Sequence, residues 1–305
     1  MRWHDGGVSG DRPGPSTRVR VWTLEGGAEV RRRDSVVTEE PLELRVSAGG
    51  VSRTVSTTMR TPGHDFELAA GFLHAEGLLP RGGPRQVSYC ADVERPDQRF
   101  NVVTIELDAP APPEPLRIGL VSSACGVCGS ASLESLRERG LTPVAAGPAV
   151  AVEVLYGLPD ALRAAQGVFS ATGGLHAAGL FTSSGEALAV REDVGRHNAV
   201  DKLVGWALLA GRLPLSDGVL MVSGRAGYEI VQKAVAAGIP VVASVSAPSS
   251  LAVAVAEDFR VTLVGFLRRR RCNVYTGRER IVLPGEEPGS TAETRPAGDV
   301  PAVAG

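Results

Sequence analysis

Residues 219–266 read VLMVSGRAGYEIVQKAVAAGIPVVASVSAPSSLAVAVAEDFRVTLVGF. Apolar runs of strand length alternate in this segment with stretches of helical periodicity: strands at 219–222, 239–245 and 261–266, and helices at 226–237 and 251–257. Short runs of β-branched residues are typical of buried strands, and the longer stretches between them can cross back over a sheet. This order of strand and helix predicts a layered α/β domain whose core is largely parallel.

The chain before this domain has a different pattern, in which short strands dominate. One-sided or alternating apolar residues predict strands at 18–24, 42–46, 51–59, 86–93 and 100–107. A single helix interrupts them at 65–76, with Gly77 as its C-terminal cap. We therefore expect an N-terminal α+β region with mostly antiparallel strands, and the last two strands are expected to pair.

The domain boundaries follow from these changes in pattern. Both ends of the chain are rich in Gly, Pro, Ser and Glu and offer few groups to bury, so they are expected to be disordered. The predicted organisation is a disordered N-terminus at 1–17, an α+β subdomain at 18–115, a cysteine loop with its following helix at 116–140, an α/β domain at 141–283 and a disordered tail at 284–305.

Composition and charge exclude several classes of protein. A net charge of −2 argues against a nucleic-acid-binding protein, and 43% hydrophobic residues are enough for a normal core. The uncharged stretch 236–256 is broken by Pro240 and Pro248, so we do not expect a membrane span. No secretory signal is visible, and four unevenly spaced cysteines do not form a disulfide framework, so a reducing cytoplasmic location is expected.

Two cysteines lie in a glycine-rich loop, SSACGVCGSAS at 122–132. A helix is expected to begin near Ser130 or Ala131, and its N-terminal dipole would favour a thiolate at Cys128 and at Cys125. On its own, this CxxC sequence is compatible with part of a zinc site, with a thioredoxin-like redox pair or with a mobile sulfur carrier. No second CxxC completes a zinc site, and no metal site is predicted.

The chain resembles the formate dehydrogenase accessory sulfurtransferase family, FdhD, along nearly its whole ordered length. The matching stretches include TEEPLELRV (38–46), MRTPGHDFELAAGFLHAEGLL (59–79), SSACGVCGSAS (122–132), REDVGRHNAVDKLVGWAL (191–208) and TLVGFLRRRRCNVYTG (262–277). A CGVCG loop followed by EDVGRHNAVDK is a specific combination, because packing alone gives neither phrase a reason to recur.

The resemblance implies a function in sulfur transfer. Members of the family take sulfur from a cysteine desulfurase and deliver it to the molybdenum bis(guanine dinucleotide) cofactor of formate dehydrogenase, which they bind transiently. It implies that Cys125 holds the persulfide, that Cys128 supports transfer or release, and that the protein is a homodimer. It also implies a cytidine-deaminase-like fold for the α/β domain. Deaminase chemistry is not expected, because His176 is not followed by the required glutamate.

A cofactor site is expected at Phe266, Leu267, Arg268, Arg269, Arg270 and Arg271, which the resemblance associates with the guanine dinucleotide. Arginine forks match phosphate oxygens in bidentate geometry, and Phe266 could stack on guanine. If the segment is extended, alternate arginines should face the ligand, so that one of the pairs 268/270 and 269/271 matters more. The competing interpretation is a solvated turn between two strands.

Other polar residues are weaker candidates. Asp193, Arg196, His197, Asn198 and Lys202 could bind the cofactor or could cap and pair, and both interpretations remain open. The segment Ser223–Arg225 follows a strand and opens a helix, where anions commonly bind, and the turn at 172–174 with His176 could lie beside it. The remaining cysteines, Cys90 and Cys272, are expected to be dispensable. The alternative function is a non-enzymatic cofactor chaperone whose CxxC is a zinc or redox switch.

Overall fold

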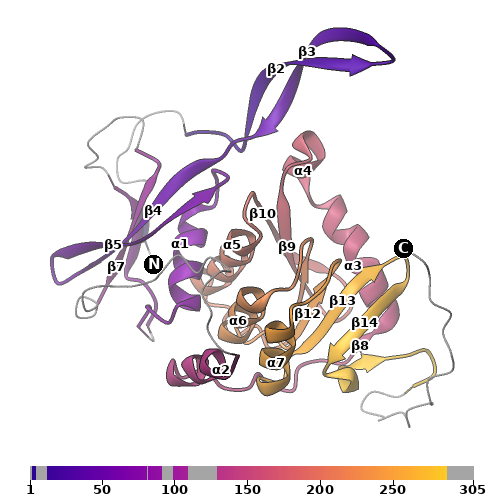
Figure 1. Cartoon of the computed structure of the whole chain (residues 1–305). Coiled ribbons are helices and arrows are strands. Elements are labelled where there is room, and N and C mark those ends of the chain that lie inside the picture. Colours follow the sequence, from indigo (N-terminus) through magenta and orange to yellow (C-terminus); the bar gives the residue numbers. More distant parts are fainter. Residues whose placement is uncertain (1, 5–11, 81, 91–98, 109–128, 287–305) are drawn as a thin grey trace.

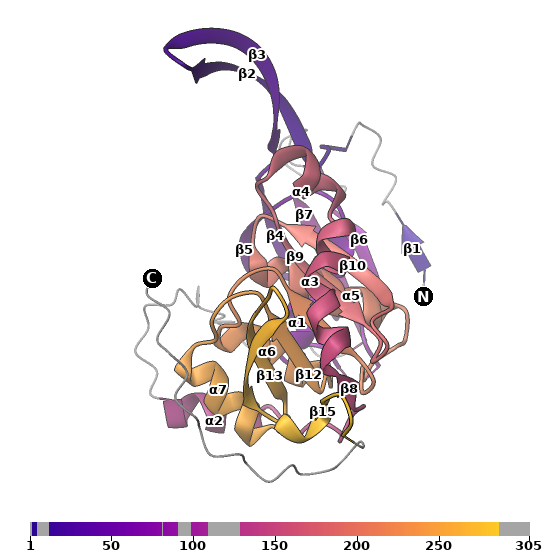
Figure 2. The same ribbon diagram turned by 90° about the vertical axis from the view of Figure 1, so that its right-hand side faces the viewer.

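The computed structural model describes residues 2–4, 12–80, 82–90, 99–108 and 129–286. Its N-terminal part contains a five-stranded sheet in the order β1-β6-β7-β4-β5 (Figures 1 and 2). The strands are β1 (Arg2–His4), β4 (Glu40–Ala48), β5 (Val51–Arg60), β6 (Gln86–Tyr89) and β7 (Val102–Leu107). The pairs β4–β5 and β6–β7 are antiparallel, whereas β1–β6 and β4–β7 are parallel. Strand β1 falls in the segment 1–17, which was expected to be disordered.

Two further strands form a separate ribbon outside this sheet. Strands β2 (Ser16–Glu25) and β3 (Ala28–Val37) pair with each other alone, and they project away from the rest of the molecule (Figures 1 and 2). Strand β3 was not predicted, because the sequence AEVRRRDSVV has neither an apolar run nor a regular alternation.

Helix α1 (Asp65–Ala75) covers one face of the N-terminal sheet and joins it to the second half of the chain. Leu68 and Leu73 are buried in the core that α1 forms with β4, β6 and β7. The opposite side of α1 packs against α5 (Arg196–Leu209), and the two backbones approach closely at two glycines. A Cβ atom on Gly71 would lie 1.9 Å from the carbonyl oxygen of Asp201, and one on Gly205 would lie 1.8 Å from that of Glu67.

The second half of the chain is a three-layer α/β structure. Its six-stranded sheet has the order β10-β9-β11-β12-β13-β14, with β11, β12 and β13 parallel and the other pairs antiparallel. The strands are β9 (His176–Phe181), β10 (Ala187–Asp193), β11 (Val219–Val222), β12 (Val241–Ser244), β13 (Thr262–Arg268) and β14 (Arg271–Thr276). This arrangement confirms the predicted α/β class and its parallel core.

Helices cover both faces of this sheet. One face is covered by α5, α6 (Tyr228–Ala236) and α7 (Ser250–Asp258), with α2 (Gly129–Glu138) beside α7 (Figures 1 and 2). The other is covered by α3 (Val152–Ala164), which is followed by α4 (Gly167–Thr172). A short sheet of β8 (Val150–Ala151) and β15 (Ile281–Val282) closes that side. Alternate residues of each central strand enter the two cores: Leu220 faces α5–α7, and Val219 and Met221 face α3.

Candidate functional site

The predicted persulfide residues, Cys125 and Cys128, lie outside the residues that the structure describes. The helix expected after them is α2, which begins at Gly129, directly after Cys128. Leu136 is fully buried and fixes α2 to the α/β core. Two ion pairs fasten the far end of the helix: Arg137 with Asp258 of α7, and Arg139 with Glu76 after α1. The N-terminal dipole that would favour a thiolate therefore belongs to a well-anchored helix.

Asp193 is the centre of a buried polar network between β10 and α5. Its carboxylate has no exposed surface and accepts hydrogen bonds from the backbone N–H groups of Thr61 (3.1 Å) and Gly195 (2.8 Å). It also accepts one from the side-chain amide of Asn198 (3.0 Å) and lies 2.7 Å from Nζ of Lys202. Lys202 in turn donates to the carbonyl oxygen of Thr61 (2.9 Å). The network links the segment before α1 to the α/β domain.

These contacts show what three of the candidate polar residues do in this fold. Asp193, Asn198 and Lys202 are buried and bound to one another, as the capping-and-pairing interpretation expects. The other two, Arg196 and His197, extend from the start of α5 and remain partly exposed. They are the members of this group that a ligand could reach.

Arg196 and His197 form, with His176 and Arg225, a basic cluster where β9 begins and β11 ends. Burial and the charge of Arg196 lower the pKa of His176 below its ordinary value. Burial lowers the pKa of His197 to about 3, and the positive charges of Arg196, Lys233 and Arg225 contribute. Both imidazoles are therefore neutral near pH 7, and the remaining charge of the cluster is that of its arginines. Within the described part of the chain, Nε of Arg196 is buried without a hydrogen-bond partner.

Two helices begin beside this cluster. Helix α5 starts after Gly195 and α6 after Gly227, and neither of these N-cap residues supplies a side-chain hydrogen bond. The first N–H groups of a helix have no partner within the helix and carry a partial positive charge. Glu229, in the first turn of α6, lies 3.1 Å from Nδ1 of His197. The basic cluster therefore combines arginine side chains with helix N-termini, an arrangement that suits a phosphate or another anion.

A cavity of about 500 Å³ adjoins the cluster at the carboxyl end of β11. His176 and Ser223 line it on the sheet side. On the opposite side it is lined by Arg163 of α3, Phe169 of α4 and Gln166 between the two helices. The residues that complete its wall are Pro159, Leu162, Gly173, Gly174, Leu175, Val194 and Val245. Open α/β sheets commonly bind ligands outside the carboxyl ends of their strands, and this cavity lies there. The structure thus brings together the turn at 172–174, His176 and Ser223, which were expected to be neighbours.

The wall of the cavity that α3 and α4 form was not predicted from the sequence. The guanidinium of Arg163 lies 4.2 Å from the ring centre of Phe169, and Gln166 is almost fully buried. A signal was present, since Val152, Leu155, Leu158 and Leu162 recur at helical spacing. Pro159 inside this stretch obscures the pattern, because proline usually ends a helix.

The arginine segment forms a tight hairpin turn between β13 and β14. Arg268 pairs with Arg271, so Arg269 and Arg270 are the two turn residues, and both have positive φ angles (50° and 57°). This is the backbone of a type I′ turn, which usually requires glycine or asparagine. The segment is therefore not extended, and the expected alternation of its arginines does not follow.

The side chains of this hairpin differ in their surroundings. Leu267 is fully buried in the core below α3, where its side chain does not face a ligand. Arg270 forms an ion pair with Glu153 (2.6 Å) and lies over the ring of Tyr156, both in α3. The other three arginines are exposed and make no ion pair within the described residues: Arg268, Arg269 and Arg271. They remain available to an anion.

Phe266 connects the hairpin to the cavity. Its ring is partly buried, its φ angle is 52°, and its backbone N–H donates to the carbonyl oxygen of Ser246 (3.1 Å). Ser246 follows Val245, which lines the cavity. The base of the arginine hairpin therefore lies beside the cavity. From the sequence, the arginine segment and the residues around His176 and Ser223 were predicted as separate sites.

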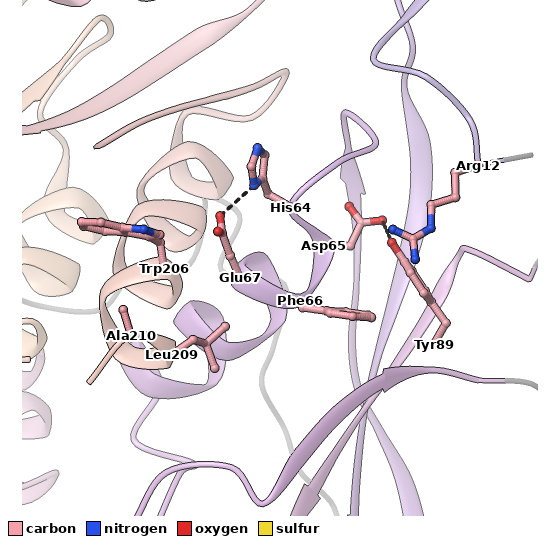
Figure 3. Close-up of a pocket in the computed structure, with 9 residues that line it drawn as sticks. All are labelled: Arg12, His64, Asp65, Phe66, Glu67, Tyr89, Trp206, Leu209 and Ala210. Atoms are coloured by element: carbon pink, nitrogen blue, oxygen red, sulfur yellow. Dashed lines mark hydrogen bonds and ion pairs between the residues drawn. The ribbon is translucent and has the colours of Figure 1, made fainter. Parts of the chain in front are cut away.

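A second cavity, of about 430 Å³, lies between α1 and α5 (Figure 3). The rings of Phe66, Tyr89 and Trp206 line it, and its carboxylates are already paired. Glu67 accepts two hydrogen bonds from Arg191 and lies 3.1 Å from Nδ1 of His64, and Asp65 is bound by Arg60 and Tyr89. The pair of Arg191 with Glu67 joins the two halves of the chain, and the other contacts lie within the N-terminal half. Together they occupy both carboxylates that line this cavity.

Comparison with known proteins identifies the chain. The model of the FdhD/NarQ family matches residues 37–282. This chain belongs to the FdhD/NarQ family. Proteins named sulfur carrier protein FdhD are similar along most of its length: that of Nocardia farcinica is 51% identical and that of Sulfurisphaera tokodaii is 44% identical, each over 87% of this chain and at least 95% of its own.

A solved structure of the same kind is also similar. The crystal structure of a proposed formate dehydrogenase accessory protein from Desulfotalea psychrophila matches with a TM-score of 0.67 and 25% identity, over 88% of this chain and 99% of its own. The FdhD/NarQ match includes the cysteine loop, the basic cluster and the arginine hairpin, but it begins only at Val37, the last residue of β3. Among the described residues, no helix is long and apolar enough to cross a membrane.

Proposed function

We propose that this chain is a sulfurtransferase that carries persulfide sulfur on Cys125 from a cysteine desulfurase to the molybdenum bis(guanine dinucleotide) cofactor of formate dehydrogenase. The observation that carries the proposal is the CGVCG loop directly before α2, in a chain whose relatives are named sulfur carriers. A thiol carrier needs a reducing compartment, so the proposed location is the cytoplasm.

The proposed chemistry uses two thiol exchanges. The thiolate of Cys125 attacks the outer sulfur of the desulfurase persulfide, a sulfur–sulfur bond forms at Cys125, and the desulfurase cysteine leaves as a thiolate. For delivery, the thiolate of Cys128 attacks the inner sulfur of the new persulfide. The sulfur–sulfur bond of the persulfide breaks, and its outer sulfur leaves for the cofactor as sulfide with the two electrons of that bond. Cys125 and Cys128 are thereby oxidised to a disulfide. A cellular thiol then reduces that disulfide.

The cofactor is substrate in this scheme, and the residues at the carboxyl end of the sheet fit its phosphates. Arg196 and Arg225 supply charge, the starts of α5 and α6 supply unpaired N–H groups, and the buried Nε of Arg196 has a hydrogen bond to give. In this proposal, the exposed arginines of the hairpin beside Phe266 add positive charge around the bound cofactor. We propose that the pyrophosphate binds at the basic cluster and the guanine enters the adjoining cavity.

Activation of a client enzyme tests the proposal. Cys125→Ala should abolish the activation of formate dehydrogenase, whereas Cys272→Ala should leave it unchanged. The second variant is a matched control, because Cys272 lies partly buried in β14 and burial raises the pKa of its thiol, which makes it a poor nucleophile. Full activation by Cys125→Ala, or stoichiometric zinc that is lost in that variant, would instead support a cofactor chaperone with a metal switch.

A further inference from the structure

Gln166, between α3 and α4, is buried, and its side-chain amide has no hydrogen bond within the described residues. The side chain is only 4% exposed, and Nε2 is fully buried. The backbone of the same residue is well bonded, since its carbonyl oxygen accepts from the N–H (3.1 Å) and from the hydroxyl (2.7 Å) of Ser170. A buried amide without a partner destabilises a fold, so its presence in the wall of a cavity points to a ligand that uses it.

A second buried glutamine shows how the fold itself satisfies such a side chain. Gln232 in α6 is 5% exposed, and its Nε2 donates to the carbonyl oxygen of Ala75 (3.4 Å). The amide of Gln232 therefore has a structural partner, whereas the amide of Gln166 has none among the described residues. The two glutamines form a natural pair for comparison.

The surroundings of Gln166 suit a flat, uncharged ring. Gln166 shares the cavity of about 500 Å³ with Arg163 and Phe169, whose guanidinium and ring lie 4.2 Å apart. Nucleic-acid bases stack on aromatic rings and on guanidinium planes. Across the cavity lies His176, which is neutral near pH 7 because its pKa is lowered. None of the described residues that line this cavity is a carboxylate.

The start of α4 is fixed by a carboxylate from the sheet. Glu192 of β10 accepts hydrogen bonds from the backbone N–H groups of Val168 (3.1 Å) and Phe169 (2.8 Å). These N–H groups are therefore occupied and are not offered to a phosphate. Gln166 directly precedes this anchored turn, so its position relative to the sheet is set before a ligand binds.

We propose that Gln166 recognises the guanine ring: its amide N–H donates to the oxygen at position 6, and its amide oxygen accepts from N1–H. An amide carries one donor and one acceptor side by side, and this edge of guanine presents the complementary pair. The inference rests on the proposed function, in which guanine enters this cavity and the pyrophosphate binds near Arg196. It assigns recognition of the base to a residue outside both the basic cluster and the arginine hairpin.

Calorimetric titration with guanosine diphosphate and with inorganic pyrophosphate tests the role of Gln166. Gln166→Met keeps the length of the side chain but removes the amide. The affinity for guanosine diphosphate should fall about tenfold or more, because two polar groups of the base would be left unpaired, and the affinity for pyrophosphate should not change. Gln232→Met, the matched control, should leave both affinities unchanged. Arg196→Ala should weaken both.

Stability separates recognition from a structural role. In urea denaturation, Gln166→Met should be at least as stable as the wild type, because it removes a buried unpaired amide, whereas Gln232→Met should be less stable. An unchanged affinity of Gln166→Met for guanosine diphosphate, or an equal loss for pyrophosphate, would overturn the inference. If Arg196→Ala alone lost nothing, the proposed phosphate site would be wrong, while the result for Gln166 would stand.

A measurement on the unaltered chain keeps the test valid if Gln166→Met does not fold. Inosine diphosphate has the same oxygen at position 6 and the same N1–H as guanosine diphosphate, and purine riboside diphosphate has neither. The second nucleotide should bind about tenfold more weakly than the first. Equal affinities, or no binding of inosine diphosphate, would overturn the recognition of the base by Gln166. Sulfur transfer by Cys125 would be unaffected, since it is measured separately on the cysteine.

Discussion

The carboxylate of Asp193 is fully buried, and its hydrogen bonds with Thr61, Gly195 and Asn198 account for both of its oxygens. Together with Lys202 it fastens the segment before α1 to the start of α5. A buried carboxylate with one ammonium partner is stable only while that partner is present. The pair of Asp193 and Lys202 therefore stabilises the contact between the two halves of the chain. Both residues belong to the sequence EDVGRHNAVDK, on which the resemblance to the family partly rests.

Lys202→Met should destabilise the protein by about 3–5 kcal/mol, because Asp193 would remain buried without a counterion. In urea denaturation, the double variant with Asp193→Asn should lose less stability than the two single variants combined. The control is Arg85→Ala, since the ion pair of Arg85 with Asp108 is exposed and should contribute less than about 1 kcal/mol. Equal, small losses for Lys202→Met and Arg85→Ala would contradict the role given to the buried pair.

His197 should make stability depend on pH. Its pKa in the folded protein is about 3, below its ordinary value, so between pH 6.5 and 5 the unfolded chain takes up a proton that the folded chain does not. The free energy of unfolding should therefore fall by about 2 kcal/mol over that range through this residue. Urea denaturation of wild type and His197→Gln in a buffer without phosphate measures it. An identical pH dependence in both proteins would show that His197 is not held neutral by the fold.

Residue chemistry alone could not separate the members of the EDVGRHNAVDK motif. Aspartate, asparagine and lysine suit both a ligand site and a buried network, and the choice depends on burial, which arises only when α1 packs on α5. Arg196 and His197 could be placed from the sequence at the start of a helix, and they open α5 directly after β10.

At the scale of single elements, the turn Arg269–Arg270 stands out. Both residues have the left-handed backbone conformation that glycine adopts at lower cost. Arg269→Gly should therefore stabilise the protein by about 1 kcal/mol while it weakens the binding of guanosine diphosphate at low salt, since it removes one exposed positive charge from the hairpin. Thermal denaturation and calorimetric titration measure the two effects. Stabilisation without weaker binding would show that Arg269 does not contact the nucleotide.

The contact between α1 and α5 depends on glycine. Because a Cβ atom on Gly205 would lie 1.8 Å from the carbonyl oxygen of Glu67, Gly205→Ala should cost about 1–3 kcal/mol or more. Gly157 in α3 is the matched control, since no atom lies within 4 Å of its Cβ position and Gly157→Ala should stabilise the helix slightly. Chemical denaturation compares the two. A neutral Gly205→Ala would mean that the helices are not in close contact.

Helices and strands with a clear period were predicted close to their observed bounds. The strands β11, β12 and β13 and the helices α1, α6 and α7 have apolar patterns that their own cores require. Strand β3 has no such core, because its two faces are exposed, and so its sequence has no strand-like alternation. A turn between two strands was one of the two interpretations of residues 268–271, and the structure has such a turn. Its left-handed backbone conformation could not be predicted, because neither central residue is glycine or asparagine.

The whole molecule consists of two halves that α1 and α5 hold in contact. The layered α/β half presents a cavity and a basic cluster at the carboxyl end of its sheet. The N-terminal half is joined to it by α1, and the β2–β3 ribbon extends from that half. The sequence showed the change of pattern between the two halves, but it did not predict β2 and β3 as a separate ribbon.

Mass spectrometry after incubation with a cysteine desulfurase and cysteine shows whether Cys125 carries the sulfur. The peptide that contains residues 122–132 should gain the mass of one sulfur atom, which a reductant removes, and Cys125→Ala should gain none. Cys90 and Cys272 should remain unmodified, since both are partly buried. Sulfur on Cys90 or Cys272, with an undiminished yield in Cys125→Ala, would show that Cys125 does not carry the transferred sulfur.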